Sequence, residues 1–453
     1  MKIALIAPAG AMHRYNGLFA KSLHYAPITL TLLAALVPEE LNAQVQIYDE
    51  SAEPIPLNLD ADIIGITCIT GTAERVYRFA DYYRGLGKTV VLGGPHPSLM
   101  PQEAKEHASS VIIGLADRTW PQLLRDYKNG SIKEYYSDEE LKSIAGRPTP
   151  KRELLKRKRY ITLNTVEVIR GCHLNCSFCA YPKAFGHCVI PRPVEEVIAE
   201  VKALRGKPVI FPDVNLLSDI AYARELFTRM IPLKRWWFGL TTSDIALDDE
   251  LVALFQKSGC KGLLIGFESV NEGSQKEMRK GFNKPSKYKE LMEKLHRHGI
   301  MVMGCFAFGS DEDGLDVFMR TVELSNEIKI DLPRFAIFTP FPKTDYYTQL
   351  EQEGRITERS WSLYDVEHCV FLPKNMSKEQ LEAGIHKAWK QAYSFKSIIK
   401  RFDIRKPRLW PFFWVYLLVN LGYRQYAEKF KIFDSKIMTD NNDIKKQEAR
   451  SKR

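Results

Sequence analysis

The sequence of 453 residues has no apolar run long enough to cross a membrane, and it has only eight cysteines. The apolar, aromatic run at 409–422 has 14 residues and contains Pro411, whereas a spanning helix needs about 20. No repeat of 20–50 residues indicates a solenoid. The first residues, MKIALIAPAG, are typical of a β-strand and lack the cleavage pattern of a signal peptide. We therefore expect a cytoplasmic protein, in which thiols stay reduced.

Acidic residues are outnumbered by basic ones, 55 against 65, which gives a net charge of +10. Such a balance favours an anionic partner, either nucleic acid or an anionic membrane, although solubility alone explains it equally well. The positive residues gather in three stretches, at 151–160, at 396–408 and in the last ten residues.

Short apolar runs alternate with helical patterns over the first 128 residues, which predicts an α/β fold with a doubly wound parallel sheet. Its ligand would bind at the carboxyl ends of the strands. The chain then turns polar and basic, with Gly146, Pro148 and Pro150, so we interpret 129–160 as a linker. The five expected strands are 2–8, 45–50, 62–69, 89–94 and 110–114.

A second β/α series begins near residue 165 and predicts an incomplete barrel of six units, with its chemistry at the carboxyl ends of the strands. Its expected strands are 165–171, 208–215, 236–242, 262–269, 301–309 and 334–341. The predicted organisation is a first domain at 1–128, the linker, a barrel at 161–345, a helical region at 346–435 and a disordered tail at 436–453.

Three cysteines, Cys172, Cys176 and Cys179, lie within RGCHLNCSFCA at C-x3-C-x2-C spacing. A structural zinc site takes four ligands, so His173 or His187 would have to complete one. Core filling is the simpler interpretation, but three core cysteines within eight residues would be unusual, and metal binding is favoured. An iron–sulfur cubane has four irons, so three thiolates leave one iron open for another ligand.

This motif after the first strand of a six-unit barrel resembles the radical S-adenosylmethionine (SAM) superfamily. The resemblance implies a [4Fe–4S] cluster on the three cysteines, with SAM bound to the open iron and cleaved to a 5′-deoxyadenosyl radical. Strand-end residues resemble that family's SAM contacts, and IGFES resembles its G-x-E-S signature. The implied SAM-binding residues are Phe178, Phe211, Asp213, Thr242, Ser243, Gly266 and Glu268. Four further cysteines, Cys188, Cys260, Cys305 and Cys369, lack ligand spacing; we expect most to be buried, and Cys188 is a weak site candidate.

The first domain resembles the cobalamin-binding domain that precedes some radical SAM barrels, because a third-strand motif at Thr67 is followed 26 positions later by Gly93-Gly94. Flavin or nucleotide binding stays open for this fold, but no G-x-G-x-x-G occurs. The resemblance departs in two places: the Asp-x-His-x-x-Gly motif is absent, which His13 does not replace, and GLADRTW lacks the usual acidic residue directly after the glycine. The implied cobalamin-binding residues are Thr67, Ile69, Thr70, Gly93, Gly94, His96 and Gly114.

Together the resemblances imply a cobalamin-dependent radical SAM enzyme, with C-methylation of an apolar, lipid or tetrapyrrole-like substrate as the favoured activity. Oxidative cyclisation or rearrangement is the alternative, followed by a non-catalytic cobalamin sensor; nucleic-acid methylthiolation is disfavoured because no N-terminal cysteine cluster is present. No catalytic acid or base can be named. The enzyme would need an electron donor such as flavodoxin or ferredoxin. The basic and apolar stretch 396–422 either packs on the barrel or contacts the inner face of a membrane.

Overall fold

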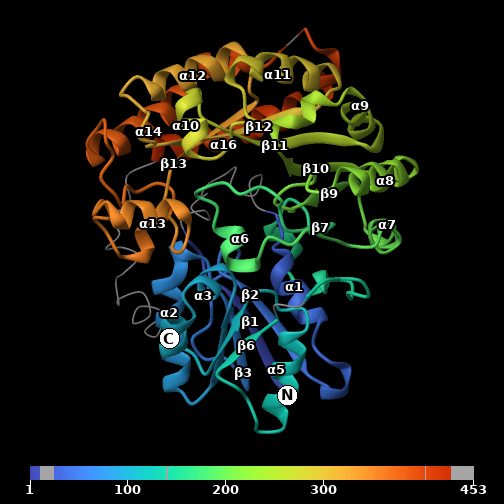
Figure 1. Cartoon of the computed structure of the whole chain (residues 1–453). Coiled ribbons are helices and arrows are strands. Elements are labelled where there is room, and N and C mark those ends of the chain that lie inside the picture. Colours follow the sequence, from blue (N-terminus) through green and yellow to red (C-terminus); the bar gives the residue numbers. More distant parts are fainter. Residues whose placement is uncertain (11–24, 139–140, 404, 430–453) are drawn as a thin grey trace.

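The computed structural model describes residues 1–10, 25–138, 141–403 and 405–429, and the two α/β units lie one above the other (Figure 1). His13 and the predicted tail at 436–453 lie outside the described residues. The doubly wound sheet and the partial barrel are both present, followed by a helical C-terminal region.

The N-terminal unit is a parallel sheet of six strands in the order β2-β1-β3-β4-β5-β6. Its strands are β1 Lys2–Ala7, β2 Gln44–Asp49, β3 Ile63–Thr67, β4 Thr89–Gly93, β5 Ser110–Ile113 and β6 Tyr135–Ser137. Its helices are α1 Ile28–Ala35, α2 Ala73–Gly85, α3 Pro95–Leu99, α4 Pro101–Glu106 and α5 Thr119–Lys128.

The central strands are buried on both faces, which explains their continuous apolar runs. Phe79 of α2 packs on one face of the sheet, and Trp120 of α5 packs on the other. The prediction of five strands was incomplete, because β6 pairs with β5 inside the expected linker. Three polar residues at Tyr135–Ser137 carry no apolar pattern, so the sequence gives little sign of this edge strand.

The second unit is a parallel sheet of five strands in the order β13-β12-β11-β10-β9. The first expected strand, 165–171, is not a regular member: Thr165 alone bridges to Ile210, and β7 pairs antiparallel with β8. The five strands of this sheet are β9 Pro208–Phe211, β10 Trp236–Thr241, β11 Cys260–Glu268, β12 Met301–Phe308 and β13 Leu332–Ile337, and the separate antiparallel pair is β7 Ile169–Arg170 with β8 Ile190–Pro191. Its helices are α6 Ala180–Phe185, α7 Val194–Ala203, α8 Ile220–Met230, α9 Asp249–Ser258, α10 Glu272–Glu277, α11 Tyr288–Arg297 and α12 Val317–Glu327.

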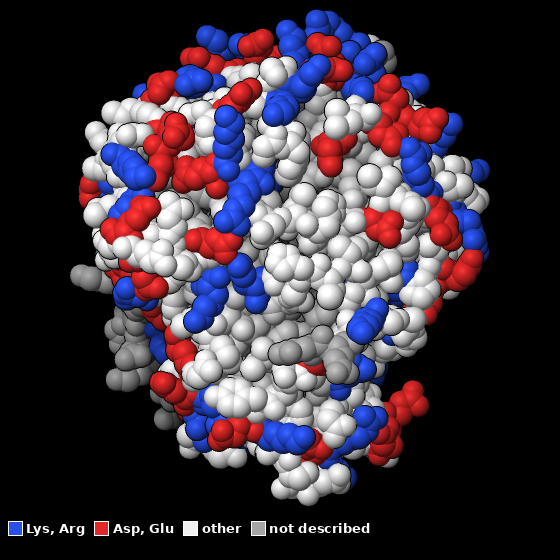
Figure 2. Space-filling view, in the orientation of Figure 1, with Lys and Arg blue, Asp and Glu red and all other residues white. Residues whose placement is uncertain are grey.

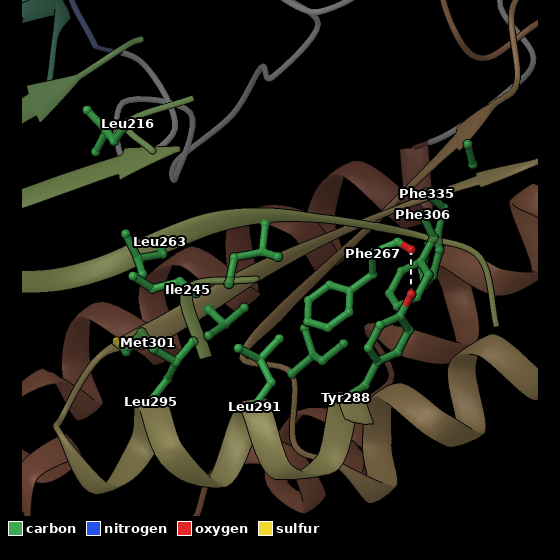
Figure 3. Close-up of a cluster of buried hydrophobic side chains, with 14 of the residues drawn as sticks. Leu216, Ile245, Leu263, Phe267, Tyr288, Leu291, Leu295, Met301, Phe306 and Phe335 are labelled. Carbon is green, nitrogen blue, oxygen red and sulfur yellow. Dashed lines mark hydrogen bonds between the residues drawn. The ribbon is translucent and has the colours of Figure 1, made fainter. Parts of the chain in front are cut away.

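Helix α11 illustrates how the barrel core forms (Figure 3). Tyr288, Leu291 and Leu295 recur at the spacing of one helical face, and all three are buried against the sheet. The Tyr288 hydroxyl donates to the Phe267 carbonyl at 2.7 Å, so the ring is buried with its polar atom satisfied. Full burial of each such side chain contributes about 1.5–3 kcal/mol.

The C-terminal region covers the edge of the sheet at β13, where Trp389 of α14 packs edge-on against Phe335 and stacks near Tyr423 of α16. Its helices are α13 Asp345–Gln352, α14 Lys378–Ala392, α15 Phe395–Arg401, the 3-10 helix η11 Pro407–Phe412 and α16 Phe413–Lys429. Among the helices of the described ranges, none is both long enough and apolar enough to cross a membrane.

Candidate functional site

The three cysteines lie in a loop that begins after β7 and ends at α6, whose N-cap residue is Cys179. Gly171, directly before Cys172, has φ +92°, and a Cβ there would lie 1.8 Å from the Cys188 carbonyl oxygen. Only glycine fits this position, because both the backbone conformation and the close contact exclude a side chain. The loop therefore depends on the glycine of the RGC sequence.

The cysteine thiols are close enough to influence one another. Burial raises the pKa of Cys176 to about 11, the thiols of Cys179 and Cys172 add to this, and the charge of Lys280 opposes it. Burial likewise raises the pKa of Cys179. Burial therefore opposes deprotonation of Cys176 and Cys179, and metal binding would have to offset this cost.

The three cysteines supply the three thiolates of a cubane cluster with one open iron. Among the residues that the structure describes, no three His, Cys, Asp or Glu side chains converge closely enough to hold one metal ion. Thiolates on different irons of a cluster stand farther apart than the ligands of one ion. The side-chain amide of Asn215, which the sequence analysis missed, lies 4.0 Å from the Cys172 sulfur.

Two of the predicted SAM-binding residues, Phe211 and Asp213, are buried beside the start of the cluster loop, and their contact with SAM stays a prediction. Phe211 is fully buried and packs on Phe227. The Asp213 carboxylate accepts hydrogen bonds from the backbone amides of Val168 and Ile169 at 2.8 and 2.7 Å. Its second oxygen is buried with no hydrogen-bond partner in the described structure, and burial raises its pKa to about 8. Strand-end position alone cannot distinguish such a buried support from a ligand contact.

The other predicted SAM contacts meet at the carboxyl ends of β10 and β11. Ser243 donates a hydrogen bond to Asn283, whose amide donates to the Gly266 carbonyl at 2.9 Å. Thr242 is mostly buried and donates to Asp244. Phe178 packs edge-on against Phe338 at the end of β13, with 5.3 Å between ring centroids. Asn283 links two strand ends, a role for which its sequence position gave no signal.

Glu268 ends β11 in a left-handed conformation, φ 62°, and pairs with a residue that the sequence analysis missed. The Lys280 ammonium lies 2.5 Å from the Glu268 carboxylate, and the two side chains are only 8% and 12% exposed. A Cβ on Gly266 would lie 2.2 Å from that carboxylate and 2.9 Å from that ammonium, so this glycine leaves room for the pair. Because both charges act on Cys176, the ion pair lies beside the cluster loop.

In the N-terminal unit, the predicted cobalamin contacts gather at the carboxyl edge of its sheet. Thr67 pairs with Gly93 across β3 and β4. Gly94 has φ +109°, and a Cβ there would lie 2.8 Å from the Cys68 carbonyl, so neighbouring backbone already requires this glycine. At Gly114, φ +78°, the space beside the backbone is open. Ser98, which was not predicted, accepts from the Gly114 amide and donates to the Gly94 carbonyl, both at 2.8 Å.

Three further predicted cobalamin contacts, Ile69 and Thr70 after β3 and His96 in α3, differ in how far they are buried. Ile69 is exposed, whereas Thr70 is buried. His96 is fully buried, with its ring nitrogens 3.3 Å from the Thr70 hydroxyl and 3.4 Å from Glu103. Glu103 also accepts from the Trp361 indole at 2.8 Å. His96 therefore forms a buried link between the sheet edge and the C-terminal region, and its contact with cobalamin stays a prediction.

The carboxyl edge of the N-terminal sheet lies next to the cluster loop at the contact between the units. Helix α3, which follows β4, lies against α6, which follows Cys179 (Figure 1). Asp117 after β5 pairs with Arg170 next to the cluster loop at 2.7 Å, and Arg147 pairs with both Asp117 and Glu167. On the face seen in Figure 2, uncharged side chains occupy most of the middle, between the two units.

The two units of the chain match two different families of known proteins. Residues 23–124 match the B12 binding domain, and residues 166–322 match the radical SAM superfamily. The chain is 31% identical over 404 residues to the bacteriochlorophyllide d C-12(1)-methyltransferase of Chlorobaculum tepidum, covering 86% of this chain and 88% of that protein. It is 23% identical to the hopanoid C-2 methylase of Rhodopseudomonas palustris, covering 83% and 73%.

Among solved structures, the fold resembles that of the radical SAM methyltransferase TsrM from Kitasatospora setae with cobalamin and a [4Fe–4S] cluster bound. The TM-score is 0.67 at 15% identity, and the match covers 94% of this chain and 99% of that one. The shared architecture therefore spans both units and most of the helical region.

Proposed function

This chain belongs to the cobalamin-dependent radical SAM family and is a methyltransferase within it, and we propose that it methylates an unactivated carbon of an apolar, tetrapyrrole-like or lipid molecule. The observation that carries the proposal is the meeting of the cluster loop with the carboxyl edge of the N-terminal sheet, at the contact of α6 with α3. A substrate held there can reach both cofactors.

The cofactors of the family are a [4Fe–4S] cluster, SAM and cobalamin, which together supply a carbon-centred radical and a transferable methyl group. We propose that Cys172, Cys176 and Cys179 hold the cluster, and that Asn215 donates to the first of these sulfurs. Asp213 holds the backbone before the loop, so it acts as a positioning residue. No residue has to serve as a general acid or base, because hydrogen abstraction by a radical needs none.

We propose that SAM lies against the ends of β10 and β11, beside Ser243, Gly266 and Glu268, with Phe178 near its adenine. The buried ammonium of Lys280 adds positive charge at this edge. Cobalamin would lie against Thr67, Ile69, Gly93 and Gly114 of the other sheet, where the side of Gly114 is open. The substrate would then lie between these two edges.

Two features support an apolar substrate. The relatives named above act on bacteriochlorophyllide d and on hopanoids, by their names. The uncharged middle of the face in Figure 2 would allow an apolar molecule to approach the contact between the units without desolvating charges. The higher identity to the bacteriochlorophyllide enzyme favours the tetrapyrrole class.

We further propose two partners. A one-electron donor such as flavodoxin or ferredoxin would reduce the cluster, because the chain's own matched domains supply no reductant. The stretch 396–422 would contact the inner face of a membrane peripherally, which would bring the enzyme to an apolar substrate.

The test is an anaerobic reaction of the reconstituted enzyme with SAM, cobalamin and reductant, supplied in parallel with tetrapyrrole and lipid extracts. 5′-Deoxyadenosine and S-adenosylhomocysteine are quantified separately, and the Cys176→Ala variant is the control. We expect both products to rise with one extract and neither to form in the variant. Deoxyadenosine alone, with an active preparation, would favour cyclisation and overturn the proposal of methyl transfer to these substrates.

A further inference from the structure

The outer side of the last two helices carries an unusual number of exposed apolar side chains. Of the 19 large hydrophobic residues that are exposed in the described structure, seven fall between residues 395 and 418. We call this surface the α15–α16 face. Its members are Phe395, Ile399, Trp410, Phe413, Trp414, Val415 and Leu418, which are 37–74% exposed.

Helical periodicity separates this face from the side that packs on the barrel. In α16, Tyr416, Asn420 and Tyr423 are buried at the spacing of one face, whereas Trp414 and Leu418 point outward one helical turn apart. In α15, Ile398 is buried and Phe395 and Ile399 are exposed. The run at 409–422 therefore packs on the barrel with one side, and on its other side Trp414 and Leu418 stay exposed among the described residues.

The two helices lie side by side and antiparallel, so their exposed residues form one surface. Phe402 at the end of α15 packs on Phe413 at the start of α16, with 5.1 Å between ring centroids. At the opposite ends, the Arg424 guanidinium lies 4.1 Å from the centre of the Phe395 ring. Between these two contacts, the Tyr416 hydroxyl of α16 donates a hydrogen bond to the Ile398 carbonyl of α15 at 2.5 Å.

Positive charge surrounds this surface. Lys396 and Lys400 are exposed neighbours of Phe395 and Ile399, and no ion pair to either is found in the described part of the chain. From residue 395 to 427 the single acidic residue is Asp403, which is buried and already paired with Lys329 and Arg405. The connection between the helices adds Lys406 and Arg408.

We propose that the α15–α16 face docks on the surface of a phospholipid bilayer with anionic headgroups. Tryptophans and aliphatic side chains would enter the boundary between headgroups and acyl chains, while the lysines and arginines pair with phosphates. The centre of a protein–protein interface is usually depleted of charged residues, whereas lysines here interleave with the apolar residues along α15. This deepens the membrane contact proposed above and does not depend on methyl transfer.

Docking in this way leaves the candidate active site uncovered. Phe412, directly before α16, lies 6.0 Å from the ring of Trp236, the first residue of β10. The Lys261 ammonium at the start of β11 lies 5.3 Å from the centre of the same Phe412 ring. The face thus begins at the amino ends of the barrel strands, opposite the ends that carry the candidate SAM contacts.

The experiment measures co-sedimentation of the full chain with vesicles of phosphatidylcholine alone and with 30 mol% phosphatidylglycerol. We expect binding to the anionic vesicles that weakens with salt. The Ile399→Ser/Trp414→Ser variant should bind at least tenfold more weakly, and Lys396→Glu/Lys400→Glu should lose the preference for anionic lipid. Leu247→Ser, at a leucine 85% exposed near the end of β10, is the matched control and should bind like the wild type.

Wild type that fails to bind either vesicle would overturn the proposal, as would equal loss in the Leu247 variant. Light scattering in the absence of lipid identifies the other possible occupant: a dimer that the Ile399/Trp414 variant dissociates would assign the face to a second copy instead. Thermal unfolding checks that the variants fold, and the exposed positions should leave the melting temperature within a few degrees. S-adenosylhomocysteine production with a detergent-dispersed extract is measured in parallel, so a failure of docking and a failure of methyl transfer are seen separately.

Discussion

The buried ion pair of Lys280 and Glu268 gives the sharpest prediction, because replacing either residue alone should lower the free energy of unfolding. Lys280→Met leaves a carboxylate, 12% exposed, without the ammonium that lies 2.5 Å away. Removing one partner of a buried ion pair typically costs about 3–5 kcal/mol, most of it from the charge left behind. We expect Glu268→Gln to cost a similar amount, since it leaves the ammonium unpaired.

The double variant Lys280→Met/Glu268→Gln should lose much less than the sum of the two single losses. No charge is then stranded, and a methionine side chain can fill the volume of the lysine stem. Since each single variant should lose about 3–5 kcal/mol and the double variant no more than one of them, we expect a coupling energy of about 3 kcal/mol or more. The exposed pair of Lys183 and Asp345, each 33% exposed, provides the control, and Lys183→Met should cost at most about 1 kcal/mol.

The assay is denaturant unfolding of all four variants and the wild type, performed anaerobically without iron, so that cofactor loading does not enter. A second set of measurements determines SAM affinity after reconstitution by equilibrium dialysis. Additive losses, within about 0.5 kcal/mol, would refute the claim that the two side chains form one buried unit. Equal effects of the Lys280 and Lys183 variants would refute the importance of burial.

Three further predictions concern the cluster loop. Because burial raises the pKa of Asp213 to about 8 from 3.8, the folded state holds an extra proton between these values. The contribution of Asp213 to stability is complete below pH 4 and is lost as pH rises to 8. The free energy of unfolding of Asp213→Asn should therefore rise relative to that of the wild type from pH 5 to 8, by at most about 1.4 kcal/mol per pH unit, as measured by denaturant unfolding; a constant difference would contradict this. Gly171→Ala should abolish iron incorporation, because its Cβ would meet the Cys188 carbonyl, whereas Gly85→Ala, at the last residue of α2 where nothing lies within 4 Å, should retain it; bound iron and visible absorption distinguish the two. Cys176→Ala should lose the cluster absorption, and Cys260→Ala, at a buried strand cysteine, should keep it; equal loss in both would contradict the assignment.

Much of the fold was predictable because it rests on local patterns. Continuous apolar runs predicted β1, β3, β4 and β5, since strands buried on both faces need apolar side chains throughout. Of the four cysteines without ligand spacing, burial is confirmed for Cys260 and Cys369, whereas Cys305 is half-buried and Cys188 is exposed. The short polar strand β6 and the irregular start of the barrel carried no such pattern.

The sequence by itself determined the chemistry of the protein, because three cysteines at fixed spacing and a glycine pair after a strand are local features tied to their cofactors. Tertiary structure alone decided which strand-end side chains are buried and which stay accessible. Asp213 and His96 occupy suitable positions in the sequence, yet both are buried and hydrogen-bonded to neighbouring segments. Lys280 and Asn283 reach the site from a loop after α10, a contact between distant segments that no local pattern records. Similarly, only packing revealed that one side of α16 is covered by the barrel and the other is exposed among the described residues.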